Sequence, residues 1–310
     1  MKKIIALFFI VGFGSAVYAQ QLPQLTQYTG NNYAINPAIA GMYDYYQVNT
    51  TIRNQWAGLS EAPRTTILSI YGKKNEHVGF GGTVYNDQAY AFGRLGGNIS
   101  YTYHVNLTAN IKAAFALAGG FGQLKISKSM LSPENNQDPV MQGGDLVRLV
   151  PDATFGLNAY GKNWYAGLSI PQLLSYSPDF LDDNVIDIMN EESEGKLVRH
   201  YYILGAYKHQ IDPFWSVEPS LLLKTAGSSP TQFDLGVKGT YDDKLWFGTG
   251  YRTNGDIACI LGYTFNERYV LGYSYDISTG ELGTVSDGSH EFMLGIRFMT
   301  NRESDIMNKE

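Results

Sequence analysis

The sequence predicts an all-β fold, a transmembrane outer-membrane antiparallel β-barrel of about 14 strands. Three observations support this prediction. Apolar and polar residues alternate in runs along the chain, short and long connections follow alternate strands, and charged residues lie on the strand face opposite the apolar residues. The composition agrees, because the chain contains 23 Tyr and 34 Gly, and tyrosine is enriched where a membrane meets water.

The first nineteen residues have the pattern of a secretory signal peptide. Met1-Lys-Lys precedes an apolar stretch at 4–14, and Val17-Tyr-Ala19 precedes Gln20, which predicts cleavage after Ala19. No later run of about eighteen apolar residues predicts a membrane helix. We therefore divide the chain into a signal peptide (1–19), an N-terminal segment (20–44), a barrel (45–299) and a polar C-terminal tail (300–310).

The composition excludes several classes of protein. Cys259 is the single cysteine, so neither an intramolecular disulfide nor a cysteine metal site is expected. The net charge is −6 and no basic run occurs, which argues against nucleic acid as a partner.

The N-terminal segment differs in character from the rest of the chain. Its stretch from Gln27 to Gly41 is rich in amide and small side chains and contains the turn-forming pair Asn36-Pro37. This composition favours an ordered but irregular segment, and its place in the periplasm or in the barrel lumen stays open.

Fourteen runs of period-two patterning follow, separated by clusters of Gly, Asn, Asp and Pro. The predicted strands are 45–55, 64–72, 77–86, 91–104, 110–125, 151–160, 164–170, 199–210, 214–225, 232–241, 244–252, 256–265, 268–276 and 289–299.

The length of each connection depends on whether it follows an even-numbered or an odd-numbered predicted strand. Links after even-numbered strands are short, and they include 161–163, 211–213, 242–243 and 266–267. The long links all follow odd-numbered strands, and they are 56–63, 126–150, 171–198 and 277–288. An outer-membrane barrel has short periplasmic turns and longer external loops, whereas a soluble sandwich gives no reason for this sorting.

The two faces of the last strand show which side meets lipid. Phe292, Leu294, Ile296 and Phe298 recur at every second residue, and Arg297 falls on the opposite face. Because a cation facing lipid near the midplane costs about 2–4 kcal/mol, charged residues are expected in the lumen. The same reasoning predicts a lumenal charge network of Glu218, Lys224, Asp234, Lys238, Arg252, Asp276 and Arg297, paired across neighbouring strands.

Several glycines fall on the predicted inner face, namely Gly79, Gly81, Gly248, Gly250 and Gly272. Glycine at such positions lets strands bend or lets a plug approach the wall. Simple β-bulges in a soluble barrel are the alternative interpretation.

The candidate catalytic and metal-binding motifs favour structural interpretations. Ser289, His290 and Glu291 cannot form a triad, because neighbouring strand residues point to opposite faces. The acidic loop 171–198 could attract calcium, but it lacks the spacing of a calcium-binding loop. We expect no enzyme activity, no cofactor and no metal site.

An ordered set of motifs runs from about residue 24 to 299. It comprises Gln27-Tyr28, Asn36-Pro-Ala-x-Ala-Gly41, Arg53-Asn-Gln-Trp56-x-Gly58, Ala62-Pro63, Phe155-Gly-x-x-x-Tyr160, Tyr165-Ala-Gly-Leu-Ser169, Gly250-Tyr-Arg252, Gly272-Tyr-Ser-Tyr-Asp276 and Gly288-Ser-His-Glu291. Together these motifs resemble the PorP/SprF family of membrane proteins associated with the type IX secretion system of Bacteroidetes-type bacteria. The polar tail after Phe298 departs from the usual end of such a barrel, close to its last aromatic residue.

The resemblance implies a non-catalytic outer-membrane barrel that helps large surface proteins to be secreted or held at the cell surface. The implied partner is a large secreted, adhesin-like protein with a C-terminal sorting domain, with type IX secretion components as possible contacts on the periplasmic side. Candidate partner-binding residues are Asn36, Pro37, Arg53, Gln55 and Trp56. The alternative hypothesis is a passive porin or small-molecule channel.

Overall fold

The computed structural model describes residues 22–131, 144–175, 197–227, 229–253 and 255–298. The predicted signal peptide and C-terminal tail, and most of the acidic loop 171–198, lie outside the described residues. Among the described residues, no helix is both long enough and apolar enough to cross a membrane.

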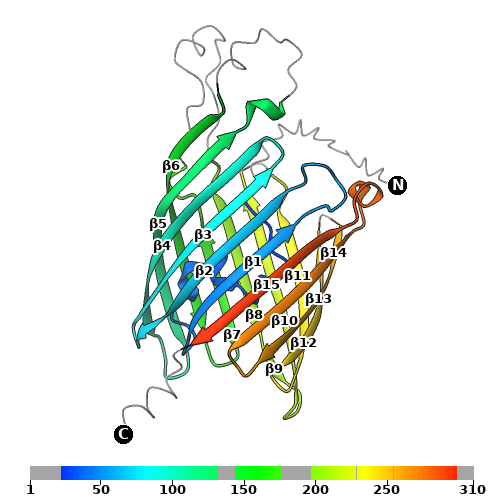
Figure 1. Ribbon diagram of the computed structural model, residues 1–310. Helices are drawn as coiled ribbons and strands as arrows, with labels where there is room; N and C mark the ends of the chain where they lie inside the picture. The colour runs from blue at the N-terminus through cyan, green and yellow to red at the C-terminus, as the bar shows by residue number, and fades with distance from the viewer. Residues whose placement is uncertain (1–21, 132–143, 176–196, 228, 254, 299–310) are drawn as a thin grey trace, which may run out of the picture.

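The strands form one closed antiparallel barrel of 14 strands (Figure 1). Neighbours in sequence pair in order around the wall, and β1 pairs with β15 to close it. The short elements β8 and β9 both pair with β10 and form one interrupted strand. The fold class predicted from the sequence is confirmed.

The elements have the following bounds: β1 (Tyr46–Asn54), β2 (Arg64–Asn75), β3 (Val78–Ala89), β4 (Phe92–Asn106), β5 (Lys112–Ile126), β6 (Leu146–Tyr160), β7 (Trp164–Ile170), β8 (His200–Tyr207), β9 (His209–Gln210), β10 (Trp215–Ala226), β11 (Gln232–Tyr241), β12 (Leu245–Arg252), β13 (Asp256–Phe265), β14 (Tyr269–Ser278) and β15 (Ser289–Phe298). The described residues also include short 3-10 helices: η1 (Asn32–Ala34) and η2 (Pro37–Ile39) before β1, η3 (Lys128–Met130) after β5 and η5 (Glu281–Thr284) after β14.

One predicted boundary was wrong by five residues. The sequence places the start of the sixth strand at Pro151, because proline cannot donate to a strand ladder. The strand instead begins at Leu146 and pairs with β5 along its full length, through Pro151 opposite Phe121. Together β5 and β6 extend the wall at the end that carries the long loops (Figure 1).

Burial alternates along the strands as the sequence predicts. On β15, Phe292, Leu294 and Ile296 are exposed, whereas Glu291 and Met293, each just before an exposed residue, are buried. The outer wall is therefore apolar, and it suits a bilayer rather than water. The barrel has two distinct ends, which we call the long-loop end and the short-turn end according to the connections found there.

The core is not formed by two packed sheets. It is formed by residues 22–45, here called the lumenal segment, which lie inside the barrel as an irregular coil with η1 and η2 (Figure 1). Leu25, Tyr33 and Ile39 of this segment pack against wall residues including Tyr71 and Tyr202. The hydrophobic effect thus stabilises the segment in the lumen, where it contacts many strands at once.

Two inward glycines make room for this segment. A Cβ atom at Gly79 would overlap the carbonyl of Ala40, and one at Gly81 would overlap the Tyr33 ring. That ring stacks on Tyr71 at 4.6 Å between centroids, and its hydroxyl lies 2.8 Å from the Ser100 hydroxyl. The wall is therefore shaped to the segment at these positions.

Replacing Gly81 by isoleucine is expected to destabilise the barrel by about 1–3 kcal/mol, the usual cost of overpacking. The added side chain must displace Tyr33 from its stacked position. The measurement is the denaturation midpoint in lipid vesicles, followed by the slower migration of unfolded barrel on gels. Gly119→Ile is the matched control, since Gly119 on the outer face has open space around it. An equal effect of both substitutions would contradict the fit between segment and wall.

Candidate functional site

The most distinctive feature of the lumen is a cluster of buried charged side chains near the long-loop end. Its members, here called the charge cluster, are Arg53, Lys224, Asp234, Arg252, Asp256, Asp276 and Glu291. They come from β1, β10, β11, β12, β13, β14 and β15. Six consecutive strands, β10 to β15, and β1, which closure of the barrel places beside β15, therefore contribute to one site.

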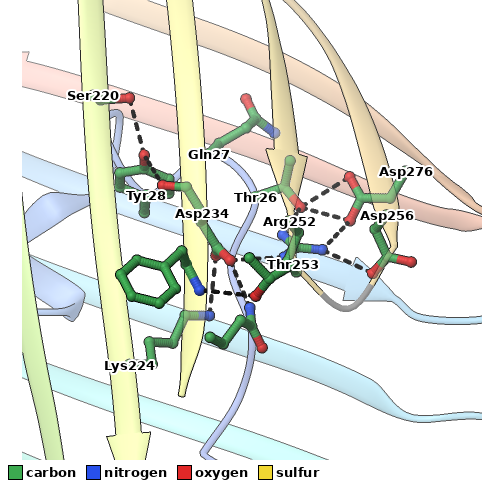
Figure 2. Close-up of polar contacts among 12 residues, drawn as sticks. Thr26, Gln27, Tyr28, Ser220, Lys224, Asp234, Arg252, Thr253, Asp256 and Asp276 are labelled. Carbon is green, nitrogen blue, oxygen red and sulfur yellow. Dashed lines mark hydrogen bonds and ion pairs between the residues drawn. The ribbon is translucent and has the colours of Figure 1, made fainter. Parts of the chain in front are cut away.

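Two arginines organise the charge cluster. Arg53, 1% exposed, places Nη2 at 2.7 Å from Oδ2 of Asp276 and Nη1 at 3.3 Å from Oε2 of Glu291. Arg252 reaches Oδ1 of Asp234 at 3.2 Å, and its Nη1 lies 3.1 Å from Asp256 and 3.3 Å from Asp276. Figure 2 shows Arg252 among these three carboxylates. Burial of such ions is tolerated only because each has opposite charges and hydrogen bonds around it.

The lumenal segment is part of this arrangement. The carboxylate of Glu291 accepts hydrogen bonds from the backbone N–H groups of Thr26 and Gln27, both at 2.8 Å. The Thr26 hydroxyl lies 2.7 Å from Oδ2 of Asp276 and accepts from Nη1 of Arg53 at 2.8 Å. The wall thus binds the main chain of the segment through charged groups, and charge-assisted bonds of this kind are stronger than neutral ones.

Beyond the charge cluster, the segment continues to bind the wall. The Tyr28 hydroxyl donates to Ser220 at 2.9 Å (Figure 2), and the Asn36 amide donates to the Leu157 carbonyl at 2.9 Å. The Ala40 carbonyl lies 2.9 Å from Nε2 of His104. These contacts fix the segment along the whole depth of the barrel.

A cavity of about 560 Å³ remains beside the segment. It lies between Thr26–Gly30 and strands β10 to β13, and it is lined by hydroxyl-bearing, aromatic and glycine residues. Lys208, Asp243 and Glu267 at the short-turn end line its mouth, and Arg252 and Asp256 line its inner end. The lumen is therefore partly hollow toward the short-turn end and occupied by the charge cluster toward the other.

The predicted lumenal network divides into three parts in the structure. Lys224, Asp234, Arg252 and Asp276 join the charge cluster. Glu218 and Lys238 form a separate pair at 2.8 Å in the cavity wall. Arg297 faces inward at the short-turn end, 3.1 Å from the Gln47 amide oxygen and over the Tyr45 ring at 4.9 Å.

Sequence reasoning missed three members of the charge cluster: Arg53, Asp256 and Glu291. Glu291 shares the inner face of β15 with Arg297, so the alternation of side chains along this strand already indicated that Glu291 faces the lumen. Asp256 pairs directly with Arg252 across the β12–β13 ladder. The role of Thr26 could not be predicted from the sequence, since its carboxylate partners, Asp276 and Glu291, lie more than two hundred residues away.

Three candidate partner-binding residues do not lie on a free surface, which corrects that prediction. Asn36 is 0% exposed and Arg53 is 1% exposed, and Pro37 is buried next to Asn36 in η2. Their polar groups are taken up by the barrel itself, because Asn36 caps η2 and Arg53 holds two carboxylates. An outside partner cannot reach them while the segment is in place.

Gln55 and Trp56 differ from those three, because they lie half-buried in the link from β1 to β2 at the long-loop end. This link is fastened to the one before β15: the Trp56 N–H donates to Ser289 Oγ at 3.1 Å, and the Ala57 N–H donates to the Gly288 carbonyl at 2.7 Å. The long-loop end therefore has an ordered rim at this point.

Among the described residues, no group of three or more His, Cys, Asp or Glu side chains is arranged to hold a metal ion. The carboxylates of the charge cluster are occupied by arginine, lysine and segment donors. The charge cluster therefore holds the lumenal segment to the barrel wall.

The closed barrel, its apolar outer wall and its internal segment define the class of the protein, an outer-membrane β-barrel with an internal plug. A family model described as "Type IX secretion system membrane protein PorP/SprF" matches residues 17–296. The chain belongs to this family. No curated protein matches the chain.

Solved structures agree on the fold at low sequence identity. The toluene transporter TbuX of Ralstonia pickettii is 9% identical, with a TM-score of 0.51, covering 84% of this chain and 91% of its own. The toluene transporter TodX of Pseudomonas putida is 10% identical, with a TM-score of 0.46, 86% of this chain and 92% of its own covered. The KdgM porin is 9% identical, with a TM-score of 0.40, 81% of this chain and 98% of its own covered. The likeness to TbuX supports the barrel fold.

Proposed function

We propose that this barrel binds one large type IX secreted protein, adhesin-like, through its C-terminal sorting domain, and assists its secretion or attachment at the cell surface. The observation that carries the proposal is membership of the PorP/SprF family over residues 17–296. The role is one of binding, without catalysis.

The structure supports binding at the long-loop end. The lumen is occupied by the segment and the charge cluster, so the surfaces left for a macromolecule are the two rims. At the long-loop end the fastened link that carries Gln55 and Trp56 supplies a rigid contact surface. Binding residues on loops held by a rigid scaffold are a common arrangement. Contacts with secretion components are assigned to the short-turn rim.

Removing the protein from cells tests the proposed function. Deletion should abolish surface display of one secreted protein and leave unrelated type IX substrates unaffected. Surface proteolysis followed by mass spectrometry measures display across all of them. Unchanged display of every substrate would remove the support for the proposal.

Replacing Trp56 by alanine is expected to lower display of that secreted protein at least tenfold, because interface tryptophans often contribute about 2 kcal/mol or more. The barrel should stay folded, since Trp56 is half-buried and outside the charge cluster. Trp164→Ala is the matched control, because Trp164 begins β7 at the short-turn end. Equal display in the two variants would place the contact elsewhere.

A passive porin or small-molecule channel is the second candidate function. The observation in its favour is the cavity of about 560 Å³, which is within the usual size range of small-molecule sites. The lumenal segment opposes it, because this segment crosses the interior that an open channel needs. Conductance measurements distinguish the two functions.

A further inference from the structure

The direction in which the lumenal segment crosses the barrel has a consequence for membrane topology. An even number of strands places the start of β1 and the end of β15 on the same side, at the short-turn end. The chain that precedes β1 would ordinarily be assigned to that side too. The contacts of the segment point to the other side.

The first described residues lie at the long-loop end. Leu22 and Gln24 line a small cavity with His200 and Ala226. His200 is the first residue of β8 and Ala226 is the last of β10, so both adjoin long-loop connections. The Gln24 amide, with its oxygen toward Arg252, accepts from Nη2 at 2.9 Å, and Arg252 ends β12.

The next residues lie progressively deeper. Thr26 and Gln27 bind Glu291, the third residue of β15. Tyr28 then reaches Ser220 in the middle of β10. The Gly30 carbonyl accepts from the Asn49 amide at 3.1 Å, in the middle of β1.

The last residues lie at the short-turn end. Ala40 contacts His104, two residues before β4 ends. The Asp44 carboxylate lies 2.8 Å from the Lys73 ammonium, near the end of β2 where the short turn to β3 begins. Tyr45 packs under Arg297 near the end of β15, and β1 starts at the next residue. The segment therefore crosses the barrel once, from one mouth to the other.

We infer that the lumenal segment starts at the outer, long-loop mouth, so that Leu22 faces the cell exterior. From Leu22 the segment runs once through the lumen to β1, and it is held there by the burial of Leu25, at 2% exposure, and by the charge cluster. Leu22 and the Trp56 link then share one external face, and an outside partner that holds Leu22 acts directly on the plug.

This inference is independent of the proposed partner, because it rests on the path of the segment alone. Its failure would leave binding at the loops standing. Failure of the proposed function would likewise leave the path of the segment unchanged.

Single cysteines and a small, charged, membrane-impermeant maleimide test the inference in intact cells. The background is the full chain with Cys259→Ser, which removes the natural thiol. Leu22→Cys reports on the start of the lumenal segment, where Leu22 is half-buried. Ser60→Cys in the β1–β2 link is the external control, and Ala109→Cys in the β4–β5 turn is the periplasmic control; both positions are exposed.

The expected result is labelling of Leu22→Cys in intact cells, as for Ser60→Cys, with Ala109→Cys labelled only after the outer membrane is permeabilised. Labelling of Leu22→Cys only after permeabilisation would overturn the inference, and so would labelling only after denaturation. Pro23→Cys is the second variant if the first does not fold, and heat-modifiable migration on gels checks folding of each.

Discussion

Replacing Glu291 by alanine is expected to destabilise the folded barrel by about 3–5 kcal/mol, the cost typical of removing one partner from a buried ion pair. The substitution leaves Arg53 with one carboxylate instead of two. It also leaves the N–H groups of Thr26 and Gln27 without their acceptor. The midpoint of urea unfolding in lipid vesicles, followed by tryptophan fluorescence, measures the loss.

Glu267→Ala is the matched control for this prediction. Glu267 lies exposed in the turn between β13 and β14, so its removal is expected to change stability by less than about 0.5 kcal/mol. If Glu291→Ala were no more destabilising than Glu267→Ala, the charge cluster would not be what holds the segment to the wall.

Deleting residues 22–41 is expected to convert a silent barrel into a conducting one. The intact protein should give no stable conductance steps in a planar bilayer, because the segment and the charge cluster occupy the lumen. Without the segment, the Thr26 and Gln27 groups that bind Glu291 and Asp276 are gone, and water can enter the space that the segment occupied. The deleted barrel keeps every residue of its fourteen strands, so closure of the wall is retained.

The two proteins are compared at equal amounts in the same lipid, with folding checked by heat-modifiable migration. Discrete steps from the intact protein would favour the channel hypothesis. Silence from the deleted protein would show that wall side chains alone close the lumen, which would contradict a role for the segment as a plug.

The barrel was predictable from the sequence because strand faces repeat every two residues. The rows on β10, β11, β12 and β15 are long, and a shift of one residue would turn every apolar side chain into the lumen. Loop lengths then distinguished the two ends without any knowledge of contacts. The start and end points of the strands could not be predicted as well. The five extra residues at the start of β6 show this, because only their pairing with β5 makes them part of the strand.

The site was predictable only in part. Inward charges such as Asp234 and Arg252 follow from the alternation of strand faces, but which side chains meet depends on strand register, which the structure defines. Arg53 was assigned to partner binding because it lies in the motif that also contains Trp56, although its position beside Ile52 already indicated an inward side chain. The path of the lumenal segment has no periodic pattern, so its contacts required the structure.

We propose that the long-loop end of this plugged barrel binds one particular secreted protein. The most direct test is purification of the tagged barrel from outer membranes in mild detergent, with mass spectrometry of what accompanies it and an unrelated tagged barrel as control. We expect recovery of the C-terminal region of one large surface protein with this barrel and not with the control, at a level that falls in Trp56→Ala but not in Trp164→Ala. Recovery of the barrel alone, or of the same proteins with both barrels, would contradict it.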